Sequence, residues 1–316
     1  MVGTQHLALG ADARAELCKV TTADGDAYAA KTSTGDQPGL AVADLLARRG
    51  VGGVPAPVRS LDGGLTSASP DGARLSLVRW VAGARVLDVG LRPHEWVRLG
   101  ELLGRLHGVP TDDPVLDGLP AEEHDPSAVV EQARAFDDRL GRALAGGDPL
   151  VAELATTWAL AGPMVLEAAA RAEQLATAAA WARADLVLCH TDPHHGNLLV
   201  DGDGEVWLVD WDDAMLAPRE ADLMFVVGGV FSHAPITEDQ VRWFFDGYQA
   251  STGVGVGDLD PDLLAYLRCV RALVDVLDFA GTVVDVQRRA PEERRSALAI
   301  AHAAVVPGAL LDLATR

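Results

Sequence analysis

Hydrophobic and polar positions alternate in short runs over the first 80 residues, a pattern typical of half-buried β-strands. Between two of these runs lies Asp24-Gly25, a dipeptide that favours a hairpin turn. The pattern predicts strands over residues 16–20, 26–31, 58–61 and 74–81, with one helix over residues 40–49. We therefore expect this part of the chain to form a small, mostly antiparallel sheet with one helix.

The spacing changes to that of amphipathic helices after about residue 83. Trp96, Leu99, Leu103 and Leu106 follow Pro93 at intervals of three and four residues, so they share one face of a helix. Further helices are predicted over residues 127–145, over residues 150–183 with a break near Gly162-Pro163, and from about residue 218 to the C-terminus.

A second strand-rich stretch interrupts the helices. Residues 186–189 form an apolar run, and residues 198–200 and 206–209 flank a turn that contains two Asp-Gly pairs. The whole pattern predicts an α+β fold with two lobes. An N-terminal lobe over residues 1–82 is built on a small antiparallel sheet, and a larger, mostly helical C-terminal lobe covers residues 83–316.

Composition narrows the classes of partner. The 316 residues include 26 basic and 46 acidic side chains, which give a formal net charge of −20. Such a chain repels phosphate backbones and anionic membrane surfaces, so we expect neither nucleic acid nor a membrane as a partner. The acidity either attracts a cationic small molecule or only aids solubility. No run of about 18 apolar residues and no signal-peptide pattern is visible, which predicts a cytoplasmic protein.

The candidate chemistry lies in the segment His-Thr-Asp-Pro-His-His-Gly-Asn over residues 190–197, followed after the hairpin by Asp-Trp-Asp over residues 210–212. Asp192 and Asn197 stand five positions apart on one loop, and the hairpin returns Asp210 to their side. Carboxylate and amide oxygens suit Mg²⁺, and a further aspartate can accept a proton from a hydroxyl group. This layout is typical of phosphoryl-transfer sites.

The loop has the spacing of the protein-kinase catalytic loop, with Thr191 in place of its arginine. Together with the closing Gly-Asn-Leu, it resembles the aminoglycoside phosphotransferase family. Residues 210–225 resemble the spectinomycin phosphotransferase branch of that family. The resemblance implies a kinase-like fold that uses Mg²⁺ and ATP or GTP. The terminal phosphate would move to a hydroxyl group of an aminocyclitol or aminoglycoside antibiotic.

The resemblance also implies roles for individual residues. Asp192 corresponds to the base that orients and deprotonates the acceptor hydroxyl, and Asn197 and Asp210 correspond to the metal ligands. Lys31 corresponds to the lysine that pairs with the nucleotide phosphates, and the loop over residues 10–13 would cover them. Arg79, Trp80 and Val81 correspond to the hinge that binds the nucleotide base. His190 and Asp222 are expected to hold the loop by hydrogen bonds.

One feature departs from the kinase pattern, which pairs its lysine with a glutamate on the first-lobe helix. The helix predicted over residues 40–49 has Asp44 as its only acid. Either Asp44 takes that place with a shorter reach, or Lys31 is held in another way.

A polycationic antibiotic would require acids around the acceptor site. The candidates are Asp212 and Asp213, which follow the proposed metal ligand, and Asp275 and Asp278, which share a helix face. For Asp275 and Asp278 the alternative is a solvated helix face near Arg271.

Three other functions remain open. His190, Asp192, His194 and His195 could bind zinc in a hydrolase. The chain could be a kinase-like binding module without activity. A metabolic kinase of the same fold could act on choline, thiamine, homoserine or methylthioribose. The sequence makes no prediction of the oligomeric state.

Overall fold

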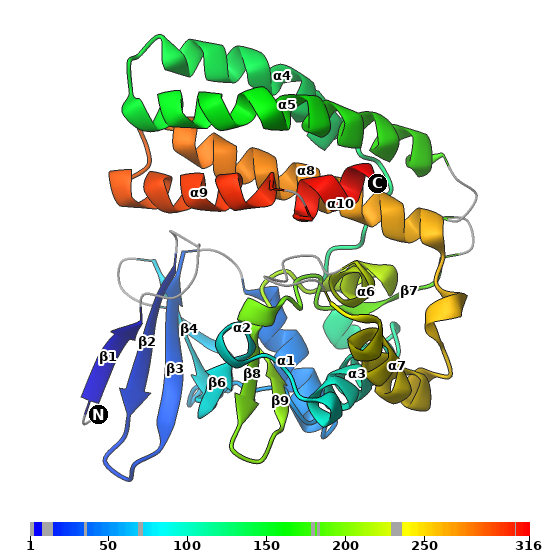
Figure 1. Cartoon of the computed structure of the whole chain (residues 1–316). Coiled ribbons are helices and arrows are strands. Elements are labelled where there is room, and N and C mark those ends of the chain that lie inside the picture. Colours follow the sequence, from blue (N-terminus) through cyan, green and yellow to red (C-terminus); the bar gives the residue numbers. More distant parts are fainter. Residues whose placement is uncertain are drawn as a thin grey trace. The chain divides into compact units, whose positions relative to one another are not determined.

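The structure, a computed structural model, describes residues 3–7, 15–34, 37–68, 72–177, 181, 184–228, 236–306 and 308–316. The chain forms two compact units (Figure 1). The first comprises Met1–Glu122, Leu186–Asp222 and Ile236–Gly257, and the second Glu123–Asp185, Leu223–Pro235 and Asp258–Arg316. The first unit holds sheets and helices and the second is helical, which confirms the predicted α+β class.

The N-terminal sheet has five antiparallel strands in the order β1-β2-β3-β5-β4. They are β1 (Gly3–Leu7), β2 (Ala15–Thr21), β3 (Ala27–Ser33), β4 (Thr66–Ala68) and β5 (Arg74–Arg79). The predicted hairpin joins β2 to β3, and Gly25 takes the left-handed φ of 91° that its turn requires. Lys31 lies on the central strand β3, opposite Leu17 on one side and Ser76 on the other.

The prediction of a strand over residues 58–61 is wrong. The amide of Val58 donates to the carbonyl of Leu77 at 2.8 Å, but the chain then turns away through residues 60–64. Pro57 makes only an isolated bridge, because proline lacks the donor that would continue a ladder. The edge of the sheet is taken instead by β4, which lies between the two segments that were predicted as strands. Helix α1 (Pro38–Arg48) forms as predicted, one or two residues earlier.

A smaller sheet of the first unit has the order β6-β8-β9, with β6 (Gly83–Arg85), β8 (Leu198–Asp201) and β9 (Val206–Leu208). Strand β7 (Leu186–Cys189) pairs with β10 (Met215–Pro218), and α2 (Val86–Val89) is a single turn. The predicted hairpin of β8 and β9 is confirmed. The lobe boundary predicted after residue 82 falls just before β6, within the first unit, and stays a prediction.

Helices α3 (Pro93–His107) and α7 (Glu238–Thr252) of the first unit pack with their backbones in close approach. A Cβ atom at Gly100 would lie 2.0 Å from the carbonyl oxygen of Phe244, and one at Gly247 would lie 2.0 Å from that of Val97. Only glycine fits either position. The predicted apolar face of α3 is buried, so His107 at the end of this helix is carried into the core.

The second unit consists of α4 (Ser127–Leu144), α5 (Pro149–Ala176), α8 (Pro261–Val284), α9 (Pro291–Ala304) and α10 (Leu310–Thr315). Helix α5 packs against α4 and α8, and α9 packs against α8 (Figure 1). Helix α6 (Glu220–Val227) connects the two units along the chain.

The predicted break near Gly162-Pro163 is wrong, because α5 runs through both residues. Proline removes one backbone hydrogen bond from a helix. Here apolar residues on both sides of Pro163, among them Leu154 and Val165, are fully buried. Burial of these side chains outweighs the loss of the one bond. Within the described part of the chain, α5 is also the one helix that is long and apolar enough to span a membrane, with a mean hydropathy of 1.3. This is weak evidence for a membrane span, because helices in the core of a protein meet the same criteria.

A buried ion pair ties α5 to α9. The Arg294 guanidinium donates to both carboxylate oxygens of Asp148 at 3.0 and 2.6 Å, and to the carbonyl of Val283 at 2.8 Å. Asp148 also caps α5 by accepting the amides of Leu150 and Val151. We expect Asp148→Ala to lower the free energy of unfolding by about 3 kcal/mol, because it leaves Arg294 buried without its partner and removes the cap. Urea unfolding at pH 7 measures the loss.

The same pair gives a dependence on pH. The Arg294 guanidinium holds the pKa of Asp148 below its usual range. A lowered pKa means that the stabilisation is complete above about pH 4, the pKa of an unfolded aspartate, and is lost as the pH falls through the folded-state value. The difference in stability between the unmodified protein and Asp148→Ala should therefore shrink as the pH falls from about 5 to about 2. An equal difference at both ends would contradict this role.

Candidate active site

The predicted catalytic loop joins β7 to β8, and His190 anchors its start. The imidazole is fully buried, where Nε2 lies 3.1 Å from the carbonyl of Val209 and Nδ1 accepts the amide of Asp192 at 3.2 Å. Burial lowers the pKa of His190, so the ring stays neutral and Nε2 carries the proton. His190 therefore ties the loop to the end of β9, as its predicted anchoring role requires.

Asp222 of α6 holds the backbone of the first two residues of the loop, His190 and Thr191. Its carboxylate accepts the amide of His190 at 3.0 Å and that of Thr191 at 2.6 Å. Thr191 has a φ of 65°, a left-handed conformation that a β-branched residue rarely adopts. The two hydrogen bonds hold the backbone in this conformation immediately before Asp192.

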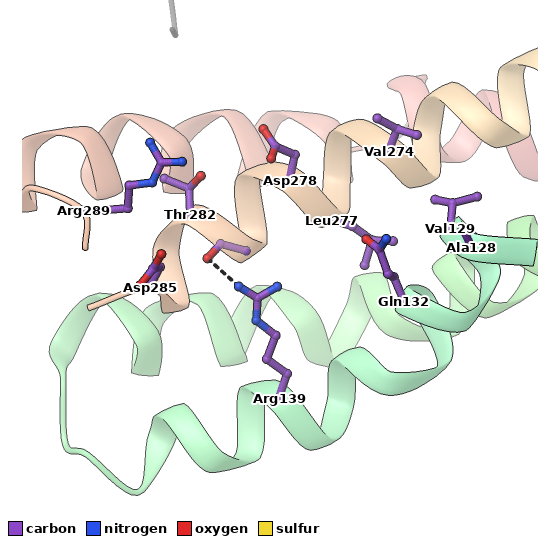
Figure 2. A pocket seen from close by; sticks show the side chains of 11 residues that line it. Ala128, Val129, Gln132, Arg139, Val274, Leu277, Asp278, Thr282, Asp285 and Arg289 are labelled. Atoms are coloured by element: carbon purple, nitrogen blue, oxygen red, sulfur yellow. Dashed lines mark hydrogen bonds between the residues drawn. The ribbon is translucent and has the colours of Figure 1, made fainter. Parts of the chain in front are cut away.

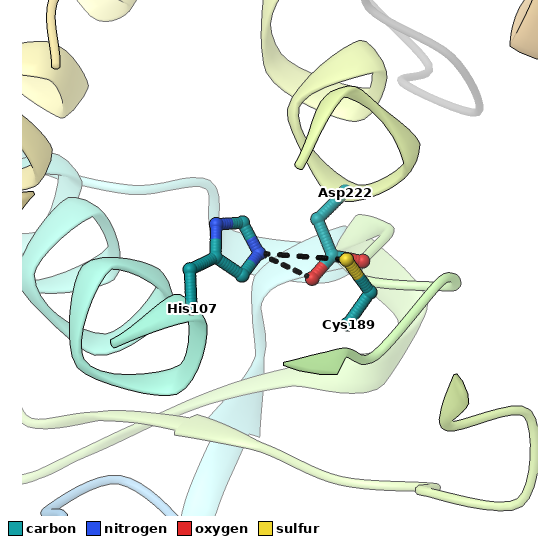
Figure 3. Close-up of side chains that lie close together, drawn as sticks. All are labelled: His107, Cys189 and Asp222. Atoms are coloured by element: carbon teal, nitrogen blue, oxygen red, sulfur yellow. Dashed lines mark hydrogen bonds and ion pairs between the residues drawn. The ribbon is translucent and has the colours of Figure 1, made fainter. Parts of the chain in front are cut away.

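Asp222 is held in turn by a buried network (Figure 3). His107 Nε2 lies 3.0 Å from Asp222 Oδ2, and His107 Nδ1 lies 2.7 Å from the hydroxyl of Tyr248. Burial raises the pKa of Tyr248, so its hydroxyl keeps its proton. Because the Asp222 carboxylate accepts, His107 is assigned the tautomer with its proton on Nε2, and Nδ1 then accepts from the Tyr248 hydroxyl.

This network has its own test. We expect Tyr248→Phe to lower the free energy of unfolding by about 1–2 kcal/mol, because His107 Nδ1 loses its donor in a buried place. The half-buried Tyr28 of β3 supplies the matched control, and Tyr28→Phe should change stability by less than about 0.5 kcal/mol. Chemical unfolding measures both variants. Equal losses would show that the hydroxyl of Tyr248 contributes nothing specific.

His107, Cys189 and Asp222 also form the one group of potential metal ligands among the described residues, with their ligand atoms within 4.8 Å of one another. The group does not fit a metal ion. Both His107 nitrogens and both Asp222 oxygens are already in hydrogen bonds, and burial raises the pKa of the Cys189 thiol well above its usual range. Among the described residues, the side chains suggested as zinc ligands do not form such a group; they are His190, Asp192, His194 and His195.

The carboxylate of Asp192 is oriented by two side chains. Asn197 Nδ2 donates to the backbone carbonyl and to Oδ2 of Asp192, both at 3.0 Å. His194 Nδ1 accepts the amide of Gly196, so its proton is on Nε2, which lies 3.4 Å from Asp192 Oδ2. The Asp192 side chain is 16% exposed, so it remains accessible to an acceptor molecule. Sequence reasoning considered His194 only as a possible zinc ligand, although its position two residues after the aspartate was a signal for this contact.

Asn197 connects this loop to Asp210. It ends a short turn of 3₁₀-helix (His195–Asn197), and its carbonyl accepts the amide of Val209 at 2.9 Å. The residue after Val209 is Asp210, whose φ of 65° turns the chain at the end of β9. Asn197 thus supplies an amide oxygen, and Asp210 supplies a half-exposed carboxylate. Both residues lie beside the hydrogen bond between Asn197 and Val209. This oxygen donor set fits Mg²⁺.

Lys31 reaches the same segment from β3. Its Nζ lies 2.5 Å from Asp212 Oδ2 and 3.5 Å from Asp210 Oδ1. The pairing with Asp44 that the sequence left open is not formed, because Asp44 Oδ2 accepts from Arg48 at 2.9 Å and from Arg59 at 2.5 Å. Lys31 is held in another way, by Asp212, which the sequence placed among the candidate substrate residues.

The predicted hinge residues lie where the five-stranded sheet continues into β6. Arg79 ends β5, and the amide of Trp80 donates to the carbonyl of Ala27 at 3.0 Å. Lys19 lies over the Trp80 ring at 4.6 Å, and Val81 is half-buried. Their role in binding a nucleotide base stays a prediction. The predicted phosphate-covering loop, residues 10–13, lies outside the described residues.

The acceptor role of the other predicted substrate residues stays a prediction. Asp213 is exposed, and its backbone carbonyl accepts the hydroxyl of Thr191 at 2.8 Å. Asp275 belongs to α8 of the second unit, where it pairs with Arg271 at 2.7 Å, and its side chain is only 13% exposed, unlike the solvated helix face of the alternative. Asp278 lines a groove of about 420 Å³ between α4 and α8, together with Arg139 and Arg289 (Figure 2).

Comparison with known proteins gives a family and a fold. The family model described as "Phosphotransferase enzyme family" matches residues 9–261. No curated protein matches the chain.

Several solved structures are similar over nearly the whole chain. A spectinomycin phosphotransferase in complex with ADP and spectinomycin is 22% identical with a TM-score of 0.83, and the match covers 98% of this chain and 92% of that one. An ethanolamine kinase of Plasmodium vivax is 11% identical with a TM-score of 0.57, covering 95% and 82%. A macrolide 2′-phosphotransferase of Brachybacterium faecium is 16% identical with a TM-score of 0.53, covering 94% and 91%. These likenesses confirm the predicted kinase-like fold.

Proposed function

Because the chain belongs to the phosphotransferase enzyme family, as its motifs predict, we propose that it transfers the terminal phosphate of ATP or GTP to a hydroxyl group of a small cationic molecule. The observation that carries the proposal is the cluster in the first unit. There Asp192 is bonded to Asn197, Asn197 to the segment that ends in Asp210, and Lys31 to Asp210 and Asp212.

Each side chain has a role in this reaction. Asp192 accepts the proton of the acceptor hydroxyl, while Asn197 and His194 keep its carboxylate turned toward that hydroxyl. Asn197 and Asp210 would hold Mg²⁺, which neutralises the charge of the phosphate oxygens when it is bound. Lys31 pairs with the phosphates as a flexible point charge.

The nucleotide is the expected phosphate donor. The similar spectinomycin phosphotransferase structure contains ADP, which supports binding of a nucleotide on this fold. The backbone of residues 79–81, where β5 ends, is the proposed binding place for the base. A nucleotide-dependent kinase with this acidic surface is proposed to act in the cytoplasm, on a cationic small molecule and without nucleic acid.

The acceptor is proposed to be an aminocyclitol of the spectinomycin type or another aminoglycoside. Its support is the spectinomycin phosphotransferase structure, which has the same fold over 98% of this chain, and a net charge of −20 that attracts polycations. A metabolic amino alcohol is the second candidate, favoured by the similar fold of an ethanolamine kinase. The inactive binding module is disfavoured, because the sequence keeps the residues proposed as base, metal ligands and phosphate-pairing lysine: Asp192, Asn197, Asp210 and Lys31.

The test is release of ADP or GDP by the purified protein with Mg²⁺ and a panel of acceptors: spectinomycin, several aminoglycosides, choline, ethanolamine and methylthioribose. We expect the fastest turnover with spectinomycin. Turnover with an amino alcohol or a sugar instead would keep the reaction and replace the acceptor. If the protein binds no nucleotide in the presence of Mg²⁺, the proposed function is wrong.

A further inference from the structure

We propose that Asp212 is a positioning residue for Lys31, and that it does for this chain what a helix glutamate does in the kinase pattern. The inference rests on the proposed function, since it concerns the lysine that would meet the nucleotide phosphates. It also changes the role of Asp212, which the sequence alone assigned to the acceptor.

The contact between Lys31 and Asp212 is direct, and a second carboxylate supports it. Lys31 stands on β3 with a strand paired on each side, and its side chain is 22% exposed. Its Nζ lies 2.5 Å from Asp212 Oδ2, whose side chain is 40% exposed, and 3.5 Å from Asp210 Oδ1. The two carboxylates therefore hold one ammonium group between them.

The tryptophan between the two aspartates fixes their direction. Trp211 is 6% exposed, donates from Nε1 to the carbonyl of Leu208 at 3.0 Å, and packs edge-on against the ring of His190 at 4.7 Å. Trp211 points into the core, whereas its two neighbours in the chain are 53% and 40% exposed and both contact Lys31.

Helix α1 supports this segment with its backbone and not with an acid. A Cβ atom at Gly39 would lie 1.8 Å from the carbonyl oxygen of Trp211, so the first turn of α1 lies directly on the Asp-Trp-Asp peptide. The one acid of this helix, Asp44, is bonded to Arg48 and Arg59. The helix thus positions Lys31 indirectly, by holding the segment that carries Asp212.

The consequence for nucleotide binding follows from the flexibility of lysine. A long side chain loses much rotamer freedom when it is fixed by a ligand, and a contact that fixes it beforehand removes part of that cost. The ammonium group has three N–H donors, so it can keep Asp212 and still donate to phosphate oxygens. Asp212 should therefore strengthen nucleotide binding only as long as Lys31 is present.

A double-mutant cycle tests this dependence. Calorimetry measures the affinity for Mg²⁺–ATP or Mg²⁺–GTP, without acceptor, in the unmodified protein, Lys31→Ala, Asp212→Asn and the double variant. We expect Asp212→Asn to weaken binding about tenfold, the upper end of the effect of immobilising one long side chain. In the Lys31→Ala background the same change should alter affinity by less than about twofold. Asp44→Asn, which removes the acid of α1, is the matched control and should leave the affinity unchanged.

A second measurement needs no nucleotide. The chain has only two lysines, Lys19 and Lys31, so labelling with an amine-acylating reagent reports on Lys31 with an internal reference. Lys19 lies on β2 opposite Ala29 and over the Trp80 ring, and its labelling rate should not change. We expect Asp212→Asn to speed the labelling of Lys31 several-fold relative to Lys19, followed by mass spectrometry.

The outcomes separate this inference from the proposed function. If the unmodified protein binds nucleotide but Asp212→Asn binds it equally well, or weakens equally with and without Lys31, the inference is overturned and the proposed function stands. A higher KM for the acceptor with unchanged nucleotide affinity would return Asp212 to the acceptor site. If the unmodified protein binds no nucleotide, the proposed function and this role of Asp212 both fail.

Discussion

Replacement of Asp192 by asparagine is expected to lower kcat by about 10³-fold, within the range that a positioned general base contributes. Asparagine has nearly the same shape, but its amide cannot accept the proton of the acceptor hydroxyl. Nucleotide affinity should stay within about twofold, because no interaction with phosphate is assigned to this side chain. Steady-state ADP release and calorimetry on the same preparation measure the two quantities.

The matched control is Asp203→Asn, which makes the same change on the exposed turn between β8 and β9. It should leave kcat within about twofold of the unmodified protein. If Asp192→Asn kept the unmodified kcat, the base would be another group. His194, at 3.4 Å from Asp192, would then be the next to test.

The sequence predicted best those elements whose pattern is long and local. Helix α3 repeats its apolar residues over four turns, and all of them are buried as expected. Strand β10 was missed, because four residues have no periodicity of their own and form a strand only when paired with β7. The interruption expected at Pro163 was wrong for the opposite reason, because packing on both sides of the proline outweighs its local preference.

The same contrast holds for the candidate site. Asp192, Asn197 and Asp210 lie on one loop and one hairpin, so their spacing along the chain already placed them near one another. The partner of Lys31 is 181 positions away, and no local pattern distinguishes Asp212 from Asp44 as that partner. Likewise, Tyr248 is 141 positions from His107, and only the close helix pair of α3 and α7 brings them together.

The second large effect is expected at Asp210. The residue has a φ of 65°, which asparagine tolerates and alanine does not, so Asp210→Asn removes the charge with the least disturbance of the backbone. In the unmodified protein Mg²⁺ should strengthen nucleotide binding, since Asp210 would supply one of the two protein oxygen ligands. In Asp210→Asn we expect most of that gain to be lost, about 100-fold in affinity or on the order of 3 kcal/mol.

Calorimetry with Mg²⁺ and with EDTA separates this role from that of Asp212. Asp210→Asn should weaken nucleotide binding mainly when Mg²⁺ is present, because the lost interaction is with the metal ion. Asp212→Asn should weaken binding in both conditions, because its effect passes through Lys31, which needs no metal to meet a phosphate. Since both aspartates contact the same Lys31 Nζ, a Mg²⁺-independent loss in Asp210→Asn would mean that Asp210 too acts by holding the lysine. An unchanged gain from Mg²⁺ in that variant would exclude Asp210 as a metal ligand.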